Sequence, residues 1–249
     1  MAKMSLLGVI PARYASTRLP GKVLLDICGK PMIQHVYERA SRASCLSELL
    51  VATDDQRVFD AVRAFGGQVV MSNPEHPNGT SRAAELAESR DADCVVNIQG
   101  DEPLLDPEMI DEVAQTLASA PDVVSATLCR PIEDEKLFAN PNVVKVVLDQ
   151  AGYALYFSRS LIPFPRENTN VPVYEHVGIY GYTRDFLLEY VRLPMTPLAE
   201  TESLEQLKIL ENGYRMKVSV TRCRSFGPNV NTEEDLKEVC RILNSAVRT

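Results

Sequence analysis

Several patterns that would assign this 249-residue sequence to a familiar class are missing from it. There is no CxxC pair and no cluster of cysteine with histidine, which excludes a zinc site of the usual kind. The six cysteines are scattered, and most lie in or beside apolar runs. We therefore expect reduced thiols in the core of a cytoplasmic protein.

Long apolar runs are also missing. No stretch approaches the ~18 residues that a membrane-spanning helix needs, so we expect no membrane insertion. The first segment, MAKMSLLGVIPAR, passes from a short apolar run directly into a polar loop without a cleavage signal. This pattern predicts a first strand rather than a signal peptide.

Positive charge is in deficit, with a formal net charge of −8 and a pI near 5.0. A nucleic-acid-binding protein needs a basic face, so we expect no nucleic-acid partner. The glycine spacings of GxGxxG and of the Walker A motif are absent as well. Their absence disfavours a nicotinamide-dependent dehydrogenase and a P-loop protein.

Composition is that of an ordinary globular protein, 45% hydrophobic and 24% charged. Apolar runs of strand length alternate with helical patterns, which indicates an α/β fold with a largely parallel sheet. We expect strands at 6–10, 48–54, 68–71, 94–98, 122–130, 143–149, 153–160, 176–183 and 215–223, and helices at 30–40, 58–65, 82–89, 109–117, 184–192, 202–213 and from about 232.

The pattern changes in the second half of the chain. A turn at Gln150–Gly152 separates two strand-like runs and predicts an antiparallel hairpin. We therefore expect one domain over 1–249, a three-layer α/β/α fold with a mixed sheet and an inserted segment at about 130–195.

A cationic loop follows the first expected strand. The stretch IPARYASTRLPGK carries Arg13, Arg18 and Lys22 on an otherwise acidic chain, and Gly21 allows backbone amides to approach a ligand. Cations in a loop of this kind can hold phosphates by charge-assisted hydrogen bonds. The alternative is a solvated polar turn whose cations are unrelated.

A second candidate segment, QGDEP, follows the apolar run CVVNI. In open α/β sheets ligands bind at the carboxyl ends of strands, and an acid such as Asp101 can hold Mg²⁺ there. The alternative role is helix capping, although Asp106 could serve as that cap. Together the two loops suit a nucleoside triphosphate with Mg²⁺, provided that Arg13, Lys22 and Asp101 converge in space.

The three histidines give weaker signals. We expect His35 to be solvated on a helix, and His76 has no evident partner in its proline-rich loop. His176 opens a strand-like run, where a structural role and a site role remain equally open.

A family resemblance rests on longer motifs. The segments VIPARYASTRLPGK, GKPMIQHVYERA, VATDD, NGTSR, VNIQGDEP, KVVLDQAGYALYFSRS, HVGIYGY and LEQLKILENG resemble the CMP-Kdo synthetase (3-deoxy-manno-octulosonate cytidylyltransferase) family in register over about 6–243. The resemblance implies a Rossmann-like nucleotide-diphospho-sugar transferase fold in which the inserted segment forms a dimer contact. It also implies a cytoplasmic, Mg²⁺-dependent homodimer that converts CTP and Kdo into CMP-Kdo and pyrophosphate for lipopolysaccharide synthesis.

The resemblance also implies roles for individual residues. It implies that Arg13, Lys22 and Asp101 act in catalysis. It also implies that Asp101 and Asn231 bind the metal. The nucleotide-binding residues implied are Arg13, Lys22, Ser81, Arg82 and Gln99, and the sugar-binding residues are Gln99, Arg159, His176, Tyr180, Glu205 and Gln206. An arginine there can pair with the sugar carboxylate, while Glu and Gln can order its hydroxyls.

Three positions depart from the family pattern. Asn231 stands where the family has an acid, so metal binding should weaken unless Asn231 only caps the helix that follows. Ser81 replaces an acid after GT, and Thr183 replaces a frequent arginine after GY. Two alternatives therefore stay open: a cytidylyltransferase for a related acidic sugar such as amino-Kdo or a sialic acid, and a weakly active or non-catalytic homologue.

Overall fold

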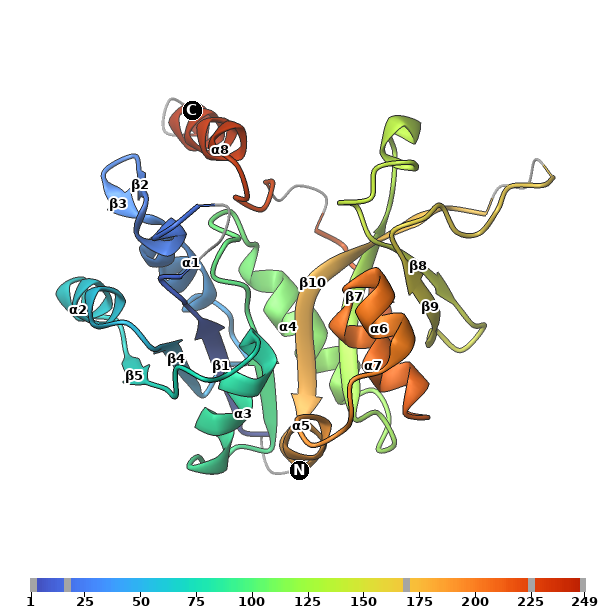
Figure 1. The fold of residues 1–249 in the computed structure, drawn as a ribbon, viewed down its shortest axis with the longest axis horizontal. Helices are drawn as coiled ribbons and strands as arrows, with labels where there is room; N and C mark the ends of the chain where they lie inside the picture. The colour runs from blue at the N-terminus through green and yellow to red at the C-terminus, as the bar shows by residue number, and fades with distance from the viewer. Residues whose placement is uncertain (1–3, 16–18, 168–170, 224–226, 247–249) are drawn as a thin grey trace. The chain divides into compact units, whose positions relative to one another are not determined.

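The computed structural model describes residues 4–15, 19–167, 171–223 and 227–246. The chain forms two compact units (Figure 1). Unit 1 comprises Met1–Asp111 and Cys223–Thr249, and unit 2 comprises Glu112–Arg222. The expected inserted segment, 130–195, falls within unit 2, and its role in dimerisation stays a prediction.

The sheet of unit 1 is parallel and has the strand order β6–β1–β4–β5. Its central strands are buried on both faces, which is why the sequence shows continuous apolar runs there rather than alternation. The strands are β1 (Leu6–Pro11), β4 (Glu48–Thr53), β5 (Val69–Met71) and β6 (Cys94–Asn97).

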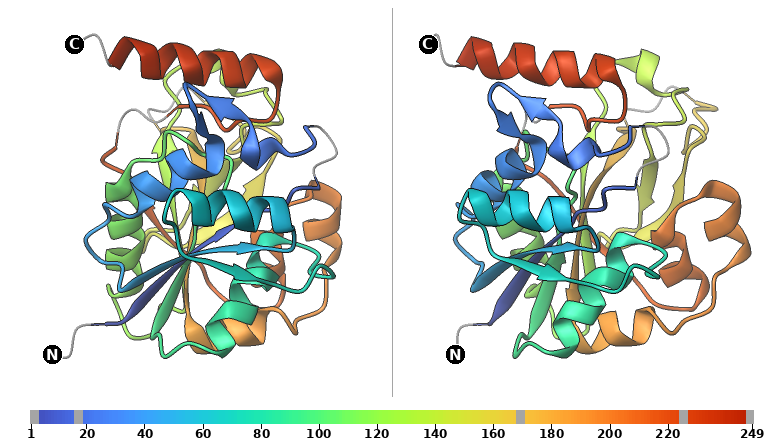
Figure 2. Two further views of the ribbon diagram at one scale, coloured as in Figure 1. Left: turned by 90° about the vertical axis from the view of Figure 1, so that its left-hand side faces the viewer. Right: turned by 60° about the vertical axis from the view of Figure 1, so that its left-hand side comes forward.

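Helices cover both faces of this sheet, with α1 and α2 on one face and α3 on the other (Figure 2). In the helix expected over 30–40, the apolar residues Met32, Ile33, Val36 and Ala40 recur at helical spacing and are buried, while Tyr37 beside them is half-buried. The helices of unit 1 are α1 (Met32–Ala40), α2 (Gln56–Ala64), α3 (Gly79–Glu88) and α8 (Glu233–Ala246), while α4 (Pro107–Leu117) contains the boundary between the units.

A short hairpin follows the cationic loop and was not predicted. It consists of the 3₁₀ turn Lys22–Leu24, then β2 (Asp26–Ile27) and β3 (Lys30–Pro31). Helix α8 packs on it (Figure 2), and Ile27 and Val239 belong to the shared apolar cluster. Strands of two residues are too short to leave a periodic signal in a sequence.

The sheet of unit 2 is mixed. Strand β7 pairs in parallel with β11 and antiparallel with β10, while β8 pairs antiparallel with both β10 and β9. The predicted hairpin is confirmed, and Gly152 at φ 75° provides its turn. The strands are β7 (Ser125–Pro131), β8 (Lys145–Leu148), β9 (Ala154–Ser158), β10 (Tyr174–Thr183) and β11 (Lys217–Val220).

The helix expected over 202–213 is wrong in its first turn. Helix α6 (Pro197–Glu202) ends there, and a separate helix α7 (Glu205–Glu211) follows. Ser203 adopts a left-handed conformation with φ 52°, which breaks the helical path between them. Unit 2 also contains the 3₁₀ turn Glu135–Leu137 and α5 (Arg184–Tyr190), whose N-cap is Thr183.

The predicted α/β fold class is thus confirmed, with a mixed sheet in unit 2. All six cysteines are free thiols, but only Cys94, Cys129 and Cys223 lie in the core as expected; Cys28 is exposed, and Cys45 and Cys240 are half-buried. Burial raises the pKa of Cys94 to about 11 and that of Cys129 to about 12, so these two thiols stay protonated at neutral pH. Among the described residues no helix combines the length and the apolar character needed to cross a bilayer.

Candidate active site

The carboxyl ends of β1 and β6 meet because the two strands are parallel neighbours. Gly100, in the loop after β6, lies so close to β1 that a Cβ atom there would come within 2.8 Å of the Pro11 carbonyl oxygen. Only glycine permits this approach. The loop after β1 and the loop after β6 are consequently held against each other.

The loop after β1 is closed by local contacts. The Gly21 amide donates to the Tyr14 carbonyl at 2.9 Å, and Gly21 adopts φ 69°. The Arg57 guanidinium lies 3.3 Å from the centroid of the Tyr14 ring and covers it. These contacts fix both ends of the loop and place Lys22 at the start of the following 3₁₀ turn. Arg18, which the sequence also suggested, lies outside the described residues.

Lys22 and Asp101 form an ion pair. The Lys22 Nζ lies 2.7 Å from Asp101 Oδ2, and the two side chains are 16% and 24% exposed. Asn231 Oδ1 lies 3.5 Å from the same ammonium, and the Val230 amide donates to the Asp101 carbonyl. The three segments of unit 1 that carry these residues are therefore brought to one point, as the sequence predicted for Lys22 and Asp101.

The capping roles considered for Asp101 and Asn231 are taken by other residues. Asp106 accepts a hydrogen bond from the Glu108 amide and caps α4. The Thr232 hydroxyl accepts from the Asp235 amide, and the Asp235 carboxylate accepts from the Thr232 amide, so this pair caps α8 and the alternative that Asn231 is the cap is wrong. Neither side chain is needed to begin a helix, and both contact Lys22.

The donor set at this point suits a hard divalent cation. Asp101 provides a carboxylate and Asn231 an amide oxygen, the ligand types preferred by a cation that also keeps water and phosphate oxygens. Across the described residues no group of three or more His, Cys, Asp or Glu gathers to form a complete metal cage. The residues thus fit an ion that is held jointly by protein and substrate.

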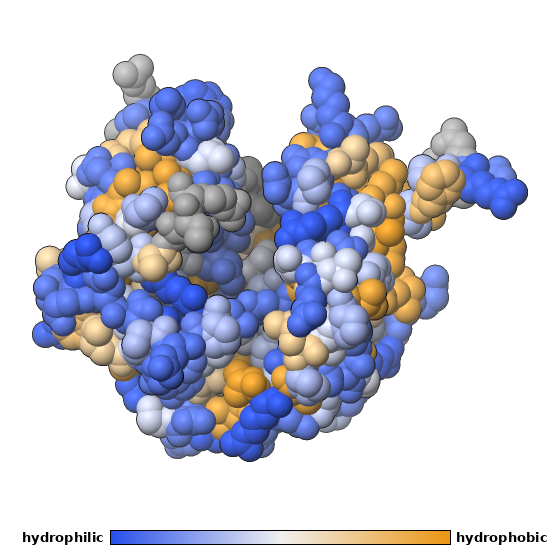
Figure 3. Space-filling view, in the orientation of Figure 1, coloured by the Kyte–Doolittle hydropathy of each residue, from blue (hydrophilic) through white to orange (hydrophobic). Residues whose placement is uncertain are grey.

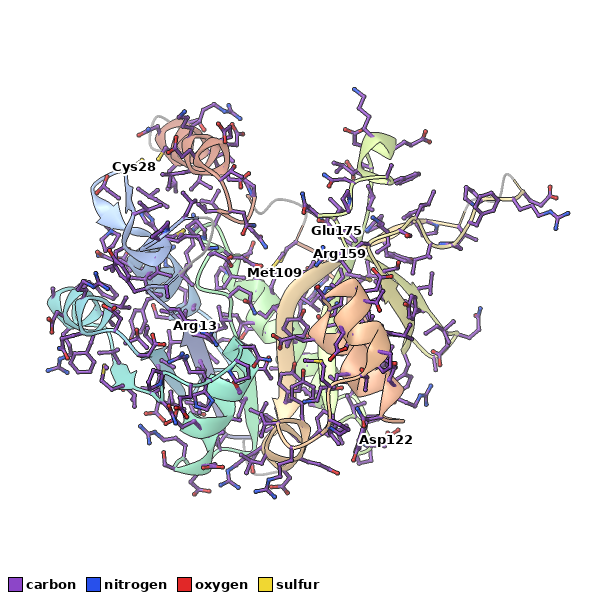
Figure 4. All side chains as sticks on the ribbon, in the orientation of Figure 1. Arg13, Cys28, Met109, Asp122, Arg159 and Glu175 are labelled. Atoms are coloured by element: carbon purple, nitrogen blue, oxygen red, sulfur yellow. The ribbon has the colours of Figure 1, made fainter. Side chains whose placement is uncertain are left out.

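Arg13 extends from the end of β1 (Figure 4) and donates a hydrogen bond to the His76 carbonyl. His76 in turn contacts Glu85 with its Nε2 at 2.7 Å, a partner that the sequence did not reveal. Arg13 therefore joins the loop after β1 to the segment that leads into α3. His35, expected to be solvated, is half-buried, and its Nε2 lies 2.8 Å from the Ile27 carbonyl oxygen.

Ser81 and Arg82 occupy the first turn of α3. The Ser81 amide and hydroxyl both bond Asn78, at 2.8 and 3.0 Å, so this serine completes the helix cap. Arg82 is fully buried and donates to Asp54 at 2.9 Å and to Ser72, and its Nε has no partner in the part of the chain that the structure describes. Gln99 is half-buried in the loop after β6. Their nucleotide-binding roles stay predictions.

In unit 2, four of the residues predicted to bind the sugar lie on β10 and α7, while Arg159 follows β9. His176 and Tyr180 project from β10 with ring centroids 5.3 Å apart, and the Phe157 ring lies edge-on with its centroid 5.0 Å from that of His176. Burial lowers the pKa of His176 to about 3, so its imidazole is neutral at physiological pH.

Gln206 lies next to this aromatic group. Its Oε1 is 3.5 Å from the Tyr180 hydroxyl, while its Nε2 is buried and has no hydrogen-bond partner among the described residues. A buried amide without a partner is costly, and a ligand could satisfy it. Glu205, the preceding residue, is half-buried, and its carbonyl accepts a hydrogen bond from Tyr190.

Arg159 (Figure 4) is held by backbone carbonyls. Its guanidinium donates to Glu202 at 2.6 Å, to Pro141 at 2.8 Å and to Ser203 at 3.2 Å. Lys145, fully buried, donates to the Arg159 carbonyl at 2.6 Å. The guanidinium thus fixes the turn before α7, and its predicted pairing with a sugar carboxylate stays a prediction. In the sequence, the sign of this network is Lys145, a charged residue within the apolar run VVKVV, and it was not predicted.

The α/β fold and the ion-paired loop ends are compatible with a nucleotidyltransferase, and the comparison with known families identifies that class. The chain belongs to the cytidylyltransferase family, whose sequence model matches residues 7–219. The family prediction made from the motifs is therefore confirmed.

Similar proteins extend over the whole chain. The 3-deoxy-manno-octulosonate cytidylyltransferase of Solibacter usitatus is 51% identical and covers 97% of this chain and 96% of its own length. The protein of the same name from Geobacter sulfurreducens is 51% identical and covers 95% of this chain and 98% of its own. A solved structure described as CMP:2-keto-3-deoxy-manno-octonic acid synthetase complexed with CTP is 44% identical, covers 97% of this chain and 99% of its own, and superposes with a TM-score of 0.93.

Proposed function

We propose that the chain transfers a cytidylyl group from CTP to Kdo, giving CMP-Kdo and pyrophosphate. The observation that carries this proposal is the contact between Lys22 and Asp101 at the adjoining ends of β1 and β6, in a chain that belongs to the cytidylyltransferase family. Curated relatives of the same length and about half-identical sequence bear the name of this activity.

The chemistry requires little covalent participation from the protein. A hydroxyl oxygen of the sugar acid attacks the α-phosphorus of CTP in line and releases its proton to solvent, the bond to the oxygen that bridges to the β-phosphorus breaks, and pyrophosphate leaves with the electron pair. Lys22 and Arg13 are the cations that would bind the triphosphate and neutralise the departing pyrophosphate. A general acid is not needed, because pyrophosphate is already a good leaving group.

We propose Mg²⁺ as the cofactor, held by Asp101 and Asn231. When bound, this ion supplies Lewis-acid charge at the phosphates. In the structure the Lys22 ammonium contacts Asp101 Oδ2 and Asn231 Oδ1, the two oxygens proposed to bind the metal. Lys22 would therefore exchange its contact with Asp101 for one with a phosphate oxygen when the substrate binds. Asn231 contributes no charge, and we therefore expect weaker metal binding than in relatives that carry an acid at this position.

On unit 2, the proposed sugar-binding residues are Arg159, His176, Tyr180, Glu205 and Gln206. The unpartnered Nε2 of Gln206 supports this assignment, because a sugar hydroxyl can accept its hydrogen bond. The neutral imidazole of His176 suits a hydroxyl rather than the sugar carboxylate.

The proposed setting is a cytoplasmic homodimer in lipopolysaccharide synthesis, supplied with CTP in a reducing compartment. The free thiols are consistent with that compartment. In unit 2 an apolar edge lies over β8 and β9 (Figure 3), and Leu155, Phe164 and Val171 are 61%, 81% and 60% exposed. Such a patch is typical of an interface between copies. Sedimentation of Phe164→Glu as a monomer, beside a wild-type dimer, would support this surface as the interface.

The direct test is pyrophosphate release from CTP and Mg²⁺ with a panel of acceptors: Kdo, amino-Kdo and a sialic acid. We expect turnover with Kdo at the highest kcat/KM. Preference for another acid would replace the substrate and keep the reaction class, whereas CTP binding without turnover for any acceptor would identify a non-catalytic homologue.

A further inference from the structure

Thr127 on β7 is fully buried and makes three polar contacts with β10. Its Oγ1 lies 2.9 Å from His176 Nε2, 2.7 Å from the Ile179 carbonyl oxygen and 3.1 Å from the Val177 carbonyl oxygen. A register shift in β10 between Val177 and Tyr180 brings the two carbonyls to one hydroxyl.

A hydroxyl has one proton to donate, and a carbonyl oxygen can only accept. The Thr127 proton must therefore point to a carbonyl, since otherwise both carbonyl oxygens would face an oxygen lone pair at close range. The shorter contact, to Ile179, is the better donor geometry. The remaining neighbour, His176 Nε2, must then donate to the Thr127 oxygen, so Nε2 carries the ring proton.

This assignment leaves His176 Nδ1 as an acceptor. A neutral imidazole carries one N–H, and no described residue makes a hydrogen bond with Nδ1. The Phe157 and Tyr180 rings both pack against the imidazole, which limits its rotation. The residue as a whole is half-buried, although its imidazole is largely enclosed by its neighbours.

We propose that Thr127 is a positioning residue that holds His176 as the Nε2–H tautomer, so that Nδ1 accepts a hydrogen bond from a hydroxyl of the sugar acid. The inference rests on the proposed function for the identity of the ligand, but the tautomer itself does not. A hydroxyl is the matching group because it can donate to Nδ1, whereas a carboxylate cannot. Gln206 Nε2 offers the complementary unsatisfied donor close to Tyr180.

The first measurement is the ring nitrogen spectrum of His176 in the free protein labelled with ¹⁵N-histidine, assigned by comparison with His176→Gln. We expect the wild type to show protonated Nε2 and unprotonated Nδ1 at pH 7.5. A protonated Nδ1, or a doubly protonated ring, would overturn the proposal without any variant having to fold.

The second measurement separates positioning from general stability. Thr127→Val removes the hydroxyl at nearly constant volume, and Thr127→Ser retains it. Thr116→Val is the matched control, because Thr116 is also a buried threonine of unit 2 with a backbone hydrogen bond, made to the Glu112 carbonyl. We expect Thr127→Val to populate the Nδ1–H tautomer and to raise the KM for Kdo about tenfold with little change in the KM for CTP, while Thr127→Ser and Thr116→Val resemble the wild type.

The outcomes distinguish the inference from the proposed function. An unchanged tautomer in Thr127→Val, or an unchanged KM for Kdo despite a changed tautomer, would overturn the positioning role. A wild type with the expected tautomer but without turnover on any sugar acid would overturn the proposed function and leave the action of Thr127 on His176 supported.

Discussion

Replacing Asn231 by Asp tests whether this position belongs to the metal site. Asn231 Oδ1 lies 3.5 Å from Lys22 Nζ, and that ammonium already pairs with Asp101 at 2.7 Å. Without metal, attraction of the new carboxylate to Lys22 opposes its repulsion by Asp101. At a water-like dielectric each contribution is about 1 kcal/mol, because both existing side chains keep some exposure, so the net change in stability is small.

With Mg²⁺ the balance changes, because a divalent cation attracts both carboxylates. The added charge should strengthen metal binding by roughly 1.4–2.8 kcal/mol, which is about a 10- to 100-fold lower half-saturating Mg²⁺ concentration. The assay titrates Mg²⁺ against pyrophosphate release and, without substrates, against the melting temperature.

Asn229→Asp serves as the matched control, since Asn229 is exposed and the substitution adds the same charge two residues away. Equal Mg²⁺ dependence of wild type, Asn231→Asp and Asn229→Asp would refute the reasoning. An equal increase in Mg²⁺ affinity in both variants would show that the added negative charge acts at long range and not as a metal ligand.

Three further perturbations probe the other contacts. Lys22→Met should raise the KM for CTP at least tenfold while leaving that for Kdo nearly unchanged, because the ammonium is assigned to the triphosphate; steady-state kinetics with each substrate varied would expose an equal effect on both. His176→Gln should remove part of the loss of stability that acid causes. The pKa of His176 is near 3 in the folded protein and about 6.5 in the unfolded chain, so the unfolded chain takes up the proton first as the pH falls. In urea denaturation the free energy of unfolding of the wild type should therefore fall by about 1 kcal/mol between pH 7.5 and 5.5, and that of the variant should not. Lys145→Met should lower the free energy of unfolding by roughly 3 kcal/mol in the same measurement, because three carbonyl oxygens, including that of Arg159, lose the ammonium that donates to them. A decrease below about 1 kcal/mol would show that the ammonium does not stabilise this network.

The parts of the fold that follow from periodicity were predictable from the sequence. The buried strands of unit 1 and the apolar stripe of α1 appeared where the pattern placed them. The contact between Lys22 and Asp101 was also predictable, because parallel neighbouring strands end at the same edge of a sheet.

The remaining features depend on helix caps and tertiary contacts that a single sequence does not determine. Thr232 rather than Asn231 caps α8, although both residue types are good caps at adjacent positions. Ser203 interrupts a segment of helical periodicity because its carbonyl and that of Glu202 are taken up by Arg159. The contact of Thr127 with His176 joins residues 49 apart in sequence and lies beside a register shift in β10. No local sequence pattern predicts such a contact.

The central claim is that Lys22 and Asp101 act on one metal-bound triphosphate. Calorimetric titration of CTP into the wild type and into Asp101→Asn, each with and without Mg²⁺, tests it most directly. We predict that Mg²⁺ tightens CTP binding to the wild type at least tenfold and that Asp101→Asn loses most of this gain. The same gain from Mg²⁺ in both proteins would contradict the account.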